Sequence, residues 1–236
     1  MRAHELVLAH LEGELVAGRV ALGGRLPAER ALAEQLGVSR SSVREAVRVL
    51  EAMGVVRTAA GSGPEAGAVV VGEPAAPLGA ALRLHAATSR LPIADVVATR
   101  VLLETWAVAE AARRARAGAG PDLADADRLL GAMDAAAEEA PDDAARYHLL
   151  DAEFHVALAA AAGNAVVEAV MASLREAIHG YVMAAVPALP SWPTTVARLR
   201  LEHRSVLDLV RAGSPDEAAA AVRAHIEGFS AEAGLG

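Results

Sequence analysis

The feature that most constrains the fold is a series of helix-forming segments that fills the sequence from residue 75 onward. Three short breaks, at 118–121, 163–164 and 214–215, contain glycine, asparagine, serine and proline residues of the kinds that end one helix or start another. No strand pattern appears between these segments. This part of the chain therefore predicts an antiparallel all-α bundle, with helices over 75–88, 93–117, 122–138, 142–161, 165–186, 194–212 and 215–231.

The amino-acid composition agrees with a helical protein and excludes several classes. Alanine inflates a hydrophobic fraction of 54%, while aromatic residues make up only 3%, so the core must consist mostly of Leu, Val and Ala. No apolar run approaches the roughly 20 residues needed to span a bilayer, and the amino terminus does not resemble a signal peptide. The absence of cysteine excludes disulfides and thiolate metal ligands. We expect a cytoplasmic protein with no membrane partner.

The first seventy residues have a different pattern, in which short helices precede two strands. A tight LGVS turn joins the second and third helices, and a glycine-rich stretch, AAGSGPEAG, separates the strands. This order predicts a winged helix-turn-helix. The predicted elements are helices over 4–17, 28–36 and 40–53 and strands over 55–58 and 68–71. We predict a DNA-binding domain over 1–72, a linker rich in proline and glycine over 73–80, and a helical domain over 81–236, so that the fold is mostly α.

The third predicted helix begins with residues suited to contact DNA. Arg40 and Arg44 can each pair with two acceptors of guanine, and the hydroxyl groups of Ser41 and Ser42 can reach phosphates. Residues 1–72 carry eight Arg and eight acidic residues, so the whole net charge of −8 lies in the remainder. Every basic residue is Arg, whose planar fork suits fixed recognition. The charge therefore favours a local recognition helix over general attraction to nucleic acid.

The bundle contains four residues whose spacing is suited to a metal site. Asp151 and His155 are four residues apart and share one helix face. His203 lies on the predicted helix over 194–212, and His225 lies on the last one, over 215–231. Together they offer only nitrogen and oxygen donors, which suit Zn²⁺, Ni²⁺, Mn²⁺ or Fe²⁺. From spacing alone, a buried histidine paired with a carboxylate is the commoner arrangement, so both interpretations stay open at this point.

Catalysis at such a metal would need a general base beside a metal-bound water. Glu153 lies about 200° around the helix from Asp151, and Glu202, next to His203, is expected to point elsewhere by the same reasoning. The HExxH pattern, a Ser/His/Asp set and a phosphate-binding loop are all absent from the sequence. We therefore predict that the chain is not an enzyme.

The first part of the chain, from LPAER through LGVSRSSVREAVRVLEAMGVV to the glycine-rich wing, resembles the GntR family of bacterial transcription regulators. The resemblance implies DNA contacts by the matching positions, which are Arg30, Arg40, Ser41, Ser42, Arg44 and a wing glycine, Gly63 or Gly61. One departure concerns the wing, which is usually basic in the family. Here Arg57 is its one positive charge and Glu65 lies near its tip, so contacts from the wing to phosphate are in doubt.

The bundle resembles the FCD class of ligand-binding domains that follow such heads. Their pattern is R-x3-E, then D-x3-H, then one histidine on each of the last two helices, and this chain matches it with Arg100 and Glu104 followed by the four residues above. The resemblance implies a metal site with Arg100 pointing inward to an acidic effector. The remaining histidines have no such placement. His179 could approach the pocket from the helix at 165–186, but we expect a surface or core position for it.

Several stretches, among them LDAEFHVAL and LPSWPTTVARLRLEHRSVL, look like actinobacterial lactate-responsive regulators of this class. The resemblance implies a homodimeric repressor that binds a palindromic operator and a divalent metal, zinc first, with L-lactate as the effector. Glycolate, pyruvate and citrate stay open as effectors, and activation stays open as the alternative to repression. A rival hypothesis is a helical interaction protein whose metal is structural and which binds no small molecule.

Overall fold

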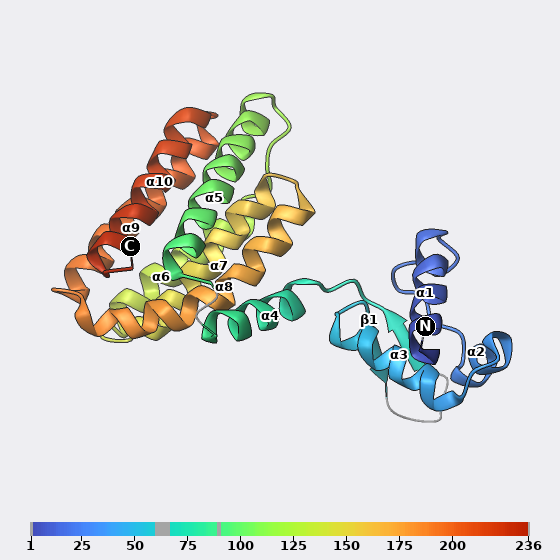
Figure 1. The fold of residues 1–236 in the computed structure, drawn as a ribbon. Helices are drawn as coiled ribbons and strands as arrows, with labels where there is room; N and C mark the ends of the chain where they lie inside the picture. The colour runs from blue at the N-terminus through green and yellow to red at the C-terminus, as the bar shows by residue number, and fades with distance from the viewer. Residues whose placement is uncertain (1, 60–66, 89–90, 236) are drawn as a thin grey trace. The chain divides into compact units, whose positions relative to one another are not determined.

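The computed structural model describes residues 2–59, 67–88 and 91–235 of the chain (Figure 1). The chain divides into two compact units, Met1–Leu78 and Gly79–Gly236. The boundary lies within helix α4 (Ala75–Ala87), so part of the stretch predicted as a linker, 73–80, is helical.

The first unit is a three-helix domain with a two-stranded hairpin. Strands β1 and β2 pair antiparallel, with Val56 opposite Val70 and Ala59 opposite Gly67. Gly37 ends α2 with a φ of 65°, a left-handed conformation that favours glycine, and thereby makes the tight turn before α3. The elements are α1 (Ala3–Val16), α2 (Glu29–Leu36), α3 (Arg40–Ala52), β1 (Val56–Ala59) and β2 (Gly67–Val70). The predicted winged helix-turn-helix is confirmed.

The side chain of Ser39 determines where the third helix of this unit begins. Its hydroxyl accepts a hydrogen bond from the backbone N–H of Ser42 at 3.2 Å, which satisfies one of the free donors of the first turn. On the opposite face of α3, Val43 and Ala46 are fully buried against Leu11 and Leu32. The apolar face holds α3 in place, so its first turn, with the predicted DNA-contacting residues, is left accessible.

The second unit is an all-helical bundle, which confirms the predicted fold class. Its elements after α4 are α5 (Ile93–Arg116), α6 (Ala124–Glu139), α7 (Ala144–Ala161), α8 (Ala165–Ala185), the short 3-10 helix η1 (Val186–Ala188), α9 (Trp192–Arg211) and α10 (Pro215–Glu232). Asn164 caps α8 by accepting hydrogen bonds from two backbone N–H groups, as its place after Gly163 predicted. Among the described residues, no helix is long and apolar enough to cross a membrane.

A continuous apolar core surrounds the face of α7 that carries the predicted metal ligands. Phe154 is fully buried, and its ring lies 5.8 Å from the ring of His155 and 5.0 Å from that of His203, between centroids. Helix α5 packs against α7, α9 and α10, and α10 also packs against α9. Helices α7, α9 and α10, which carry the predicted ligands, therefore belong to one bundle (Figure 1).

Candidate functional site

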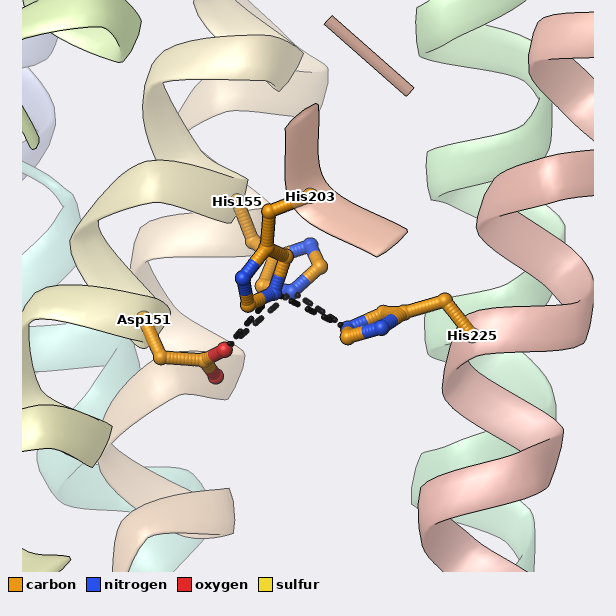
Figure 2. A group of neighbouring side chains, drawn as sticks. All are labelled: Asp151, His155, His203 and His225. Carbon is orange, nitrogen blue, oxygen red and sulfur yellow. Dashed lines mark hydrogen bonds and ion pairs between the residues drawn. The ribbon is translucent and has the colours of Figure 1, made fainter. Parts of the chain in front are cut away.

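The four predicted metal ligands meet inside the bundle. Asp151 and His155 come from α7, His203 from α9 and His225 from α10, and one donor atom from each lies within 4.8 Å of all the others. Figure 2 shows the three imidazoles and the carboxylate turned toward a common point. Nε2 of His225 is 3.2 Å from Nε2 of both His155 and His203, and Nε2 of His203 is 2.9 Å from Oδ1 of Asp151. The three histidines are buried, whereas Asp151 is partly accessible.

Two glutamates contact these histidines from outside the group. Oε2 of Glu104 lies 2.5 Å from Nδ1 of His155, and Oε2 of Glu202 lies 2.8 Å from Nδ1 of His225. A carboxylate at Nδ1 favours the tautomer that carries its proton there, which leaves the lone pair of Nε2 for a metal. Glu202 was expected to point away from the metal centre. It does not reach the centre, but it orients one of the ligands.

The electrostatics favour an ionised Asp151 and neutral imidazoles at His203 and His225. Burial raises the pKa of Asp151, but the hydrogen bond that the carboxylate accepts from His203 and the other histidines nearby outweigh burial and hold this pKa well below its usual value. Burial also lowers the pKa of His203, and burial with the nearby charge of His203 lowers the pKa of His225 to about 4. An ionised carboxylate and neutral imidazoles are the forms that coordinate a divalent cation.

The donor set fits a single divalent ion. Around an ion bound at about 2.0–2.2 Å, neighbouring donor atoms are separated by about 3 Å, which the distances within this group approach. With the Nδ1 protons directed outward, the Nε2 lone pairs of His155 and His225 would face each other at 3.2 Å. Such an arrangement is unfavourable unless a cation lies between the lone pairs. The four residues therefore fit a metal better than they fit a hydrogen-bonded core.

A small cavity of about 40 Å³ lies directly beside the four residues. Since one water needs about 10–15 Å³, the cavity admits only a small molecule. Arg100 lines it, as the FCD resemblance implied, and its polar wall also includes Asp151, His155 and His225. The rest of the lining is mostly apolar. It consists of Ala152, Val156, Met171, Ile178, Val182, Leu199, Ile226 and Phe229, together with the polar residues His148, Arg175 and His179.

Two of the other histidines, His148 on α7 and His179 on α8, also line the cavity. His148 had no predicted place there. His179 was expected at a surface or core position, although the sequence allowed it to approach the pocket from α8. His148 lies three residues before Asp151, and His179 follows Arg175 by four, so each shares a helix face with a residue at the site. This spacing was available in the sequence, but it indicates a common site only once α7 and α8 are known to pack together.

Arg100 is held by a buried ion pair. Its Nε lies 2.5 Å from Oε1 of Glu104, and the two side chains are only 13% and 2% exposed. Burial alone would raise the pKa of Glu104, but the charges of Arg100 and His155 lower it to about 2. Glu104 therefore stays ionised and connects the arginine of the cavity to a metal ligand.

In the first unit, the predicted DNA-contacting residues cluster at the start of α3. Arg40 and Arg44 are 63% and 53% exposed, and both lie near Glu29, with Nη2 of Arg44 at 2.9 Å from its Oε2. The hydroxyl groups of Ser41 and Ser42 lie 2.8 and 2.9 Å from that of Ser39. The structure thus brings together both arginines and both serines on one accessible turn.

The remaining predicted DNA contacts are less well grouped. Arg30 on α2 is 79% exposed and lies 3.9 Å from Glu34. Gly63 and the alternative Gly61 lie outside the described residues. Arg57, the one positive charge predicted for the wing, has Nη2 at 2.6 Å from Oε1 of Glu73, so its charge is balanced within the unit.

Comparison with known proteins identifies both parts of the chain. Residues 4–65 match the model described as "Bacterial regulatory proteins, gntR family", and residues 95–228 match the FCD domain. A Streptococcus agalactiae GntR structure aligns over 95% of this chain and 98% of its own, with a TM-score of 0.66 and 25% sequence identity.

Two curated Escherichia coli K12 proteins are each 30% identical to this chain. The "Glc operon transcriptional activator" covers 94% of this chain and 85% of its own length, and the "Putative L-lactate dehydrogenase operon regulatory protein" covers 86% and 76%. Both names are those of regulators, and this supports the prediction that the chain is not an enzyme. The chain therefore belongs to the gntR family of bacterial regulatory proteins, as a DNA-binding transcriptional regulator with an FCD domain.

Proposed function

We propose that the protein is a transcriptional repressor whose operator binding is controlled by a small carboxylate, with L-lactate as the first candidate, bound at a divalent metal in the bundle. The observation that carries the proposal is the convergence of Asp151, His155, His203 and His225 beside a small cavity. Three of these residues, Asp151, His155 and His225, line the cavity together with Arg100. A metal alone would need only the four ligands. The adjoining cavity with a cationic side chain provides space and charge for an acid.

Zinc is the metal that we propose first, with nickel, manganese and iron as the alternatives. Three imidazoles and one carboxylate are within the ligand range of each of these ions. The bound ion would supply a Lewis-acidic position for a carboxylate or hydroxyl oxygen of the effector. The chain's own residues hold that ion, orient its ligands through Glu104 and Glu202, and exclude bulk water with an apolar wall.

Two arguments favour L-lactate as the effector, its ability to chelate a metal ion and the name of one sequence relative. A 2-hydroxy acid can chelate one ion through its hydroxyl and one carboxylate oxygen, and its small size suits a cavity of about 40 Å³. One relative is named as a regulatory protein of an L-lactate dehydrogenase operon. Another relative is named an activator, so repression, which we propose from the resemblance, needs its own test.

At the DNA, Arg40 and Arg44 would bind base edges, and Arg30, Ser41, Ser42 and Gly63 would bind the backbone. A homodimer would place two such heads on a palindromic operator, because two-fold symmetry of the protein is matched by symmetry of the site. Effector binding would then bias the placement of the heads, provided that the effector binds one arrangement of the dimer better than the other.

One face of the bundle supports the proposed homodimer. Leu102 and Trp106 on α5 are 68% and 40% exposed, and they lie beside a row of alanines on α10. Arg113, Arg223, Asp216 and Glu227 surround this apolar strip. The rim has charges of both signs, so a second copy of the same face could meet it without a net repulsion. We expect Leu102→Glu to give a monomer in light scattering, because it places a charge within the apolar strip. Leu201→Glu should keep the mass of a dimer, since it changes an equally exposed leucine on α9, outside this strip.

Titration calorimetry of the metal-loaded protein with L-lactate tests the effector proposal. Heat that disappears after chelation of the metal is the expected result. Binding that survives chelation would make the metal structural and direct the search to Arg100. No heat with L-lactate, glycolate, pyruvate or citrate would favour the rival, a helical protein whose metal holds only the fold.

A further inference from the structure

The cavity contains two arginines, and the charge of one of them is already balanced. Arg100 has its Nε at 2.5 Å from Oε1 of Glu104, in a pair whose glutamate is almost fully buried. Its other N–H groups can donate hydrogen bonds to a ligand, but a carboxylate that approaches them meets a pair whose net charge is zero. Arg100 can therefore orient an acid without providing most of the attraction for it.

Arg175 on α8 is the other arginine that lines the cavity, and its pair is of a different kind. Its Nη1 lies 3.3 Å from Oε1 of Glu153 on α7, and the two side chains are 36% and 46% exposed. Water screens such a pair, so little is lost when it is broken. Glu153 is not one of the residues that line the cavity. The charge of Arg175 is thus available to an incoming anion.

Two unpartnered nitrogens lie among the same lining residues. Nδ1 of His179 and Nε2 of His148 are buried, and neither has a hydrogen-bond partner among the described residues. His179 follows Arg175 by one helical turn, so both belong to one face of α8. A buried polar atom without a partner is unfavourable by about 1–3 kcal/mol, and a bound polar ligand can remove this penalty. The end of the cavity formed by α8 therefore has both a cation and free hydrogen-bonding groups.

We infer that Arg175 is the residue that receives the second carboxylate oxygen of the effector, exchanging Glu153 for it, while His148 and His179 donate hydrogen bonds to the same oxygen. The inference rests on the proposed function, because it assumes a small acid at the metal. The ligand class is a small 2-hydroxy or 2-keto acid, which binds the metal through its substituted end and directs a carboxylate oxygen to α8. In this arrangement the acid replaces an ion pair that joins α7 to α8.

Two variants of opposite sign test this assignment by calorimetry of the zinc-loaded protein with L-lactate. Arg175→Ala removes charge-assisted hydrogen bonds, so we expect binding weaker by roughly 10- to 150-fold. Glu153→Gln removes the internal competitor, so we expect binding tighter by about two- to fivefold. Arg175→Lys keeps the charge but loses the fork, and it should fall between wild type and Arg175→Ala. Zinc content should be unchanged in all three variants, because none alters a metal ligand.

The outcomes separate this inference from the function on which it rests. If wild type binds L-lactate and Arg175→Ala binds it equally well, Arg175 is not the anchor and the proposed function still stands. Glu153→Gln with weaker or unchanged binding would also overturn the exchange. If wild type binds none of L-lactate, glycolate, pyruvate and citrate, the proposed function and the inference both fail. In the double variant Arg175→Ala/Glu153→Gln, the gain in affinity from Glu153→Gln should disappear, because Glu153 competes with the effector only for Arg175.

Discussion

Arg44 of the first unit and Arg100 of the second each pair with a glutamate at hydrogen-bonding distance, but the two pairs differ in burial. Arg44 and Glu29 are 53% and 34% exposed, whereas Arg100 and Glu104 are 13% and 2% exposed. At the surface, water competes for both charges, and the pair contributes little to stability. In the interior water does not compete for either charge, so removing one partner leaves the other with much of its desolvation uncompensated.

The comparison separates two uses of the same chemical contact. The pair at the start of α3 can exchange its glutamate for a phosphate or a guanine, because water already weakens it. The pair on α5 keeps its partner, and Glu104 also contacts Nδ1 of the metal ligand His155. An exposed pair can therefore hold a side chain ready for a ligand, whereas a buried pair fixes the geometry of a site.

Breaking the buried pair should have the largest effect. Glu104→Ala leaves the buried guanidinium of Arg100 without its hydrogen-bonded counter-charge, and we expect the free energy of unfolding to fall by about 3–5 kcal/mol. The change also removes the outer partner of His155, so zinc affinity should fall in protein that still folds. Chemical denaturation of the metal-free protein measures the first effect.

Glu104→Gln is the matched control, since it keeps the volume and one acceptor but removes the charge. It should lose less stability than Glu104→Ala. A Glu104→Ala protein as stable as wild type would mean that the buried pair behaves like the exposed one, and the distinction between them would fail.

Removal of a metal ligand should have the next largest effect, and it acts on metal binding more than on the apo fold. Loss of an outer partner typically lowers metal affinity 10- to 100-fold, so His203→Ala should lower it at least as much. Zinc at 100 times its dissociation constant stabilises a protein by about 2.7 kcal/mol, and the variant should lose this increment. Elemental analysis and thermal melts with and without chelator measure both effects. His85→Ala, at an exposed histidine of α4, should keep full metal. Full metal in the His203→Ala protein would show that His203 is not a ligand.

The sequence predicted the fold better than it predicted the outer parts of the site. Helix ends follow local chemistry, such as Gly37 before α3 and Asn164 at the start of α8, and local chemistry is visible in one sequence. Asp151 and His155 were found for the same reason, since four residues on one helix fix a common face. The histidines of α9 and α10 could be named as candidates from their places on two predicted helices. Deciding between a metal site and a buried histidine–carboxylate pair needed the family resemblance, because sequence spacing does not reveal which helices pack together.

The residues that were missed depend on contacts between helices. Glu202 stands next to His203 in sequence, but its carboxylate turns to His225 on the neighbouring helix. Arg175 and His179 form an ordinary i,i+4 pair on α8, and only the packing of α8 against α7 makes them part of the cavity. Side-chain periodicity, which is visible in the sequence, shows on which face of its own helix a residue lies. Which residue it contacts on another helix depends on tertiary packing, which the sequence does not show.

In the first unit, loss of Arg44 should weaken DNA binding without unfolding the protein. One well-formed arginine–guanine contact accounts for roughly 5- to 150-fold in binding, so Arg44→Ala should lose most of its operator affinity at physiological salt. Its melting temperature should stay near that of wild type, in contrast with Glu104→Ala. Arg48→Ala is the matched control, because it removes the same charge from an exposed position one turn further along α3. Equal losses in the two variants would indicate general charge attraction in place of base recognition.

The smallest effect is expected for Glu29→Gln, and its sign tests the comparison most directly. Hydrogen bonds and charge from Arg44 lower the pKa of Glu29, so this carboxylate is ionised and competes with DNA for the arginine. If Glu29 only competes with DNA for Arg44, the variant should bind operator DNA a few times more tightly. Its free energy of unfolding should change by no more than about 0.5 kcal/mol. A fluorescence titration with the upstream DNA of its own gene, repeated in the Arg44→Ala background, measures the coupling between the two residues. Weaker binding by Glu29→Gln would mean that Glu29 aims Arg44 at its base, and the exposed pair would then fix geometry as the buried one does.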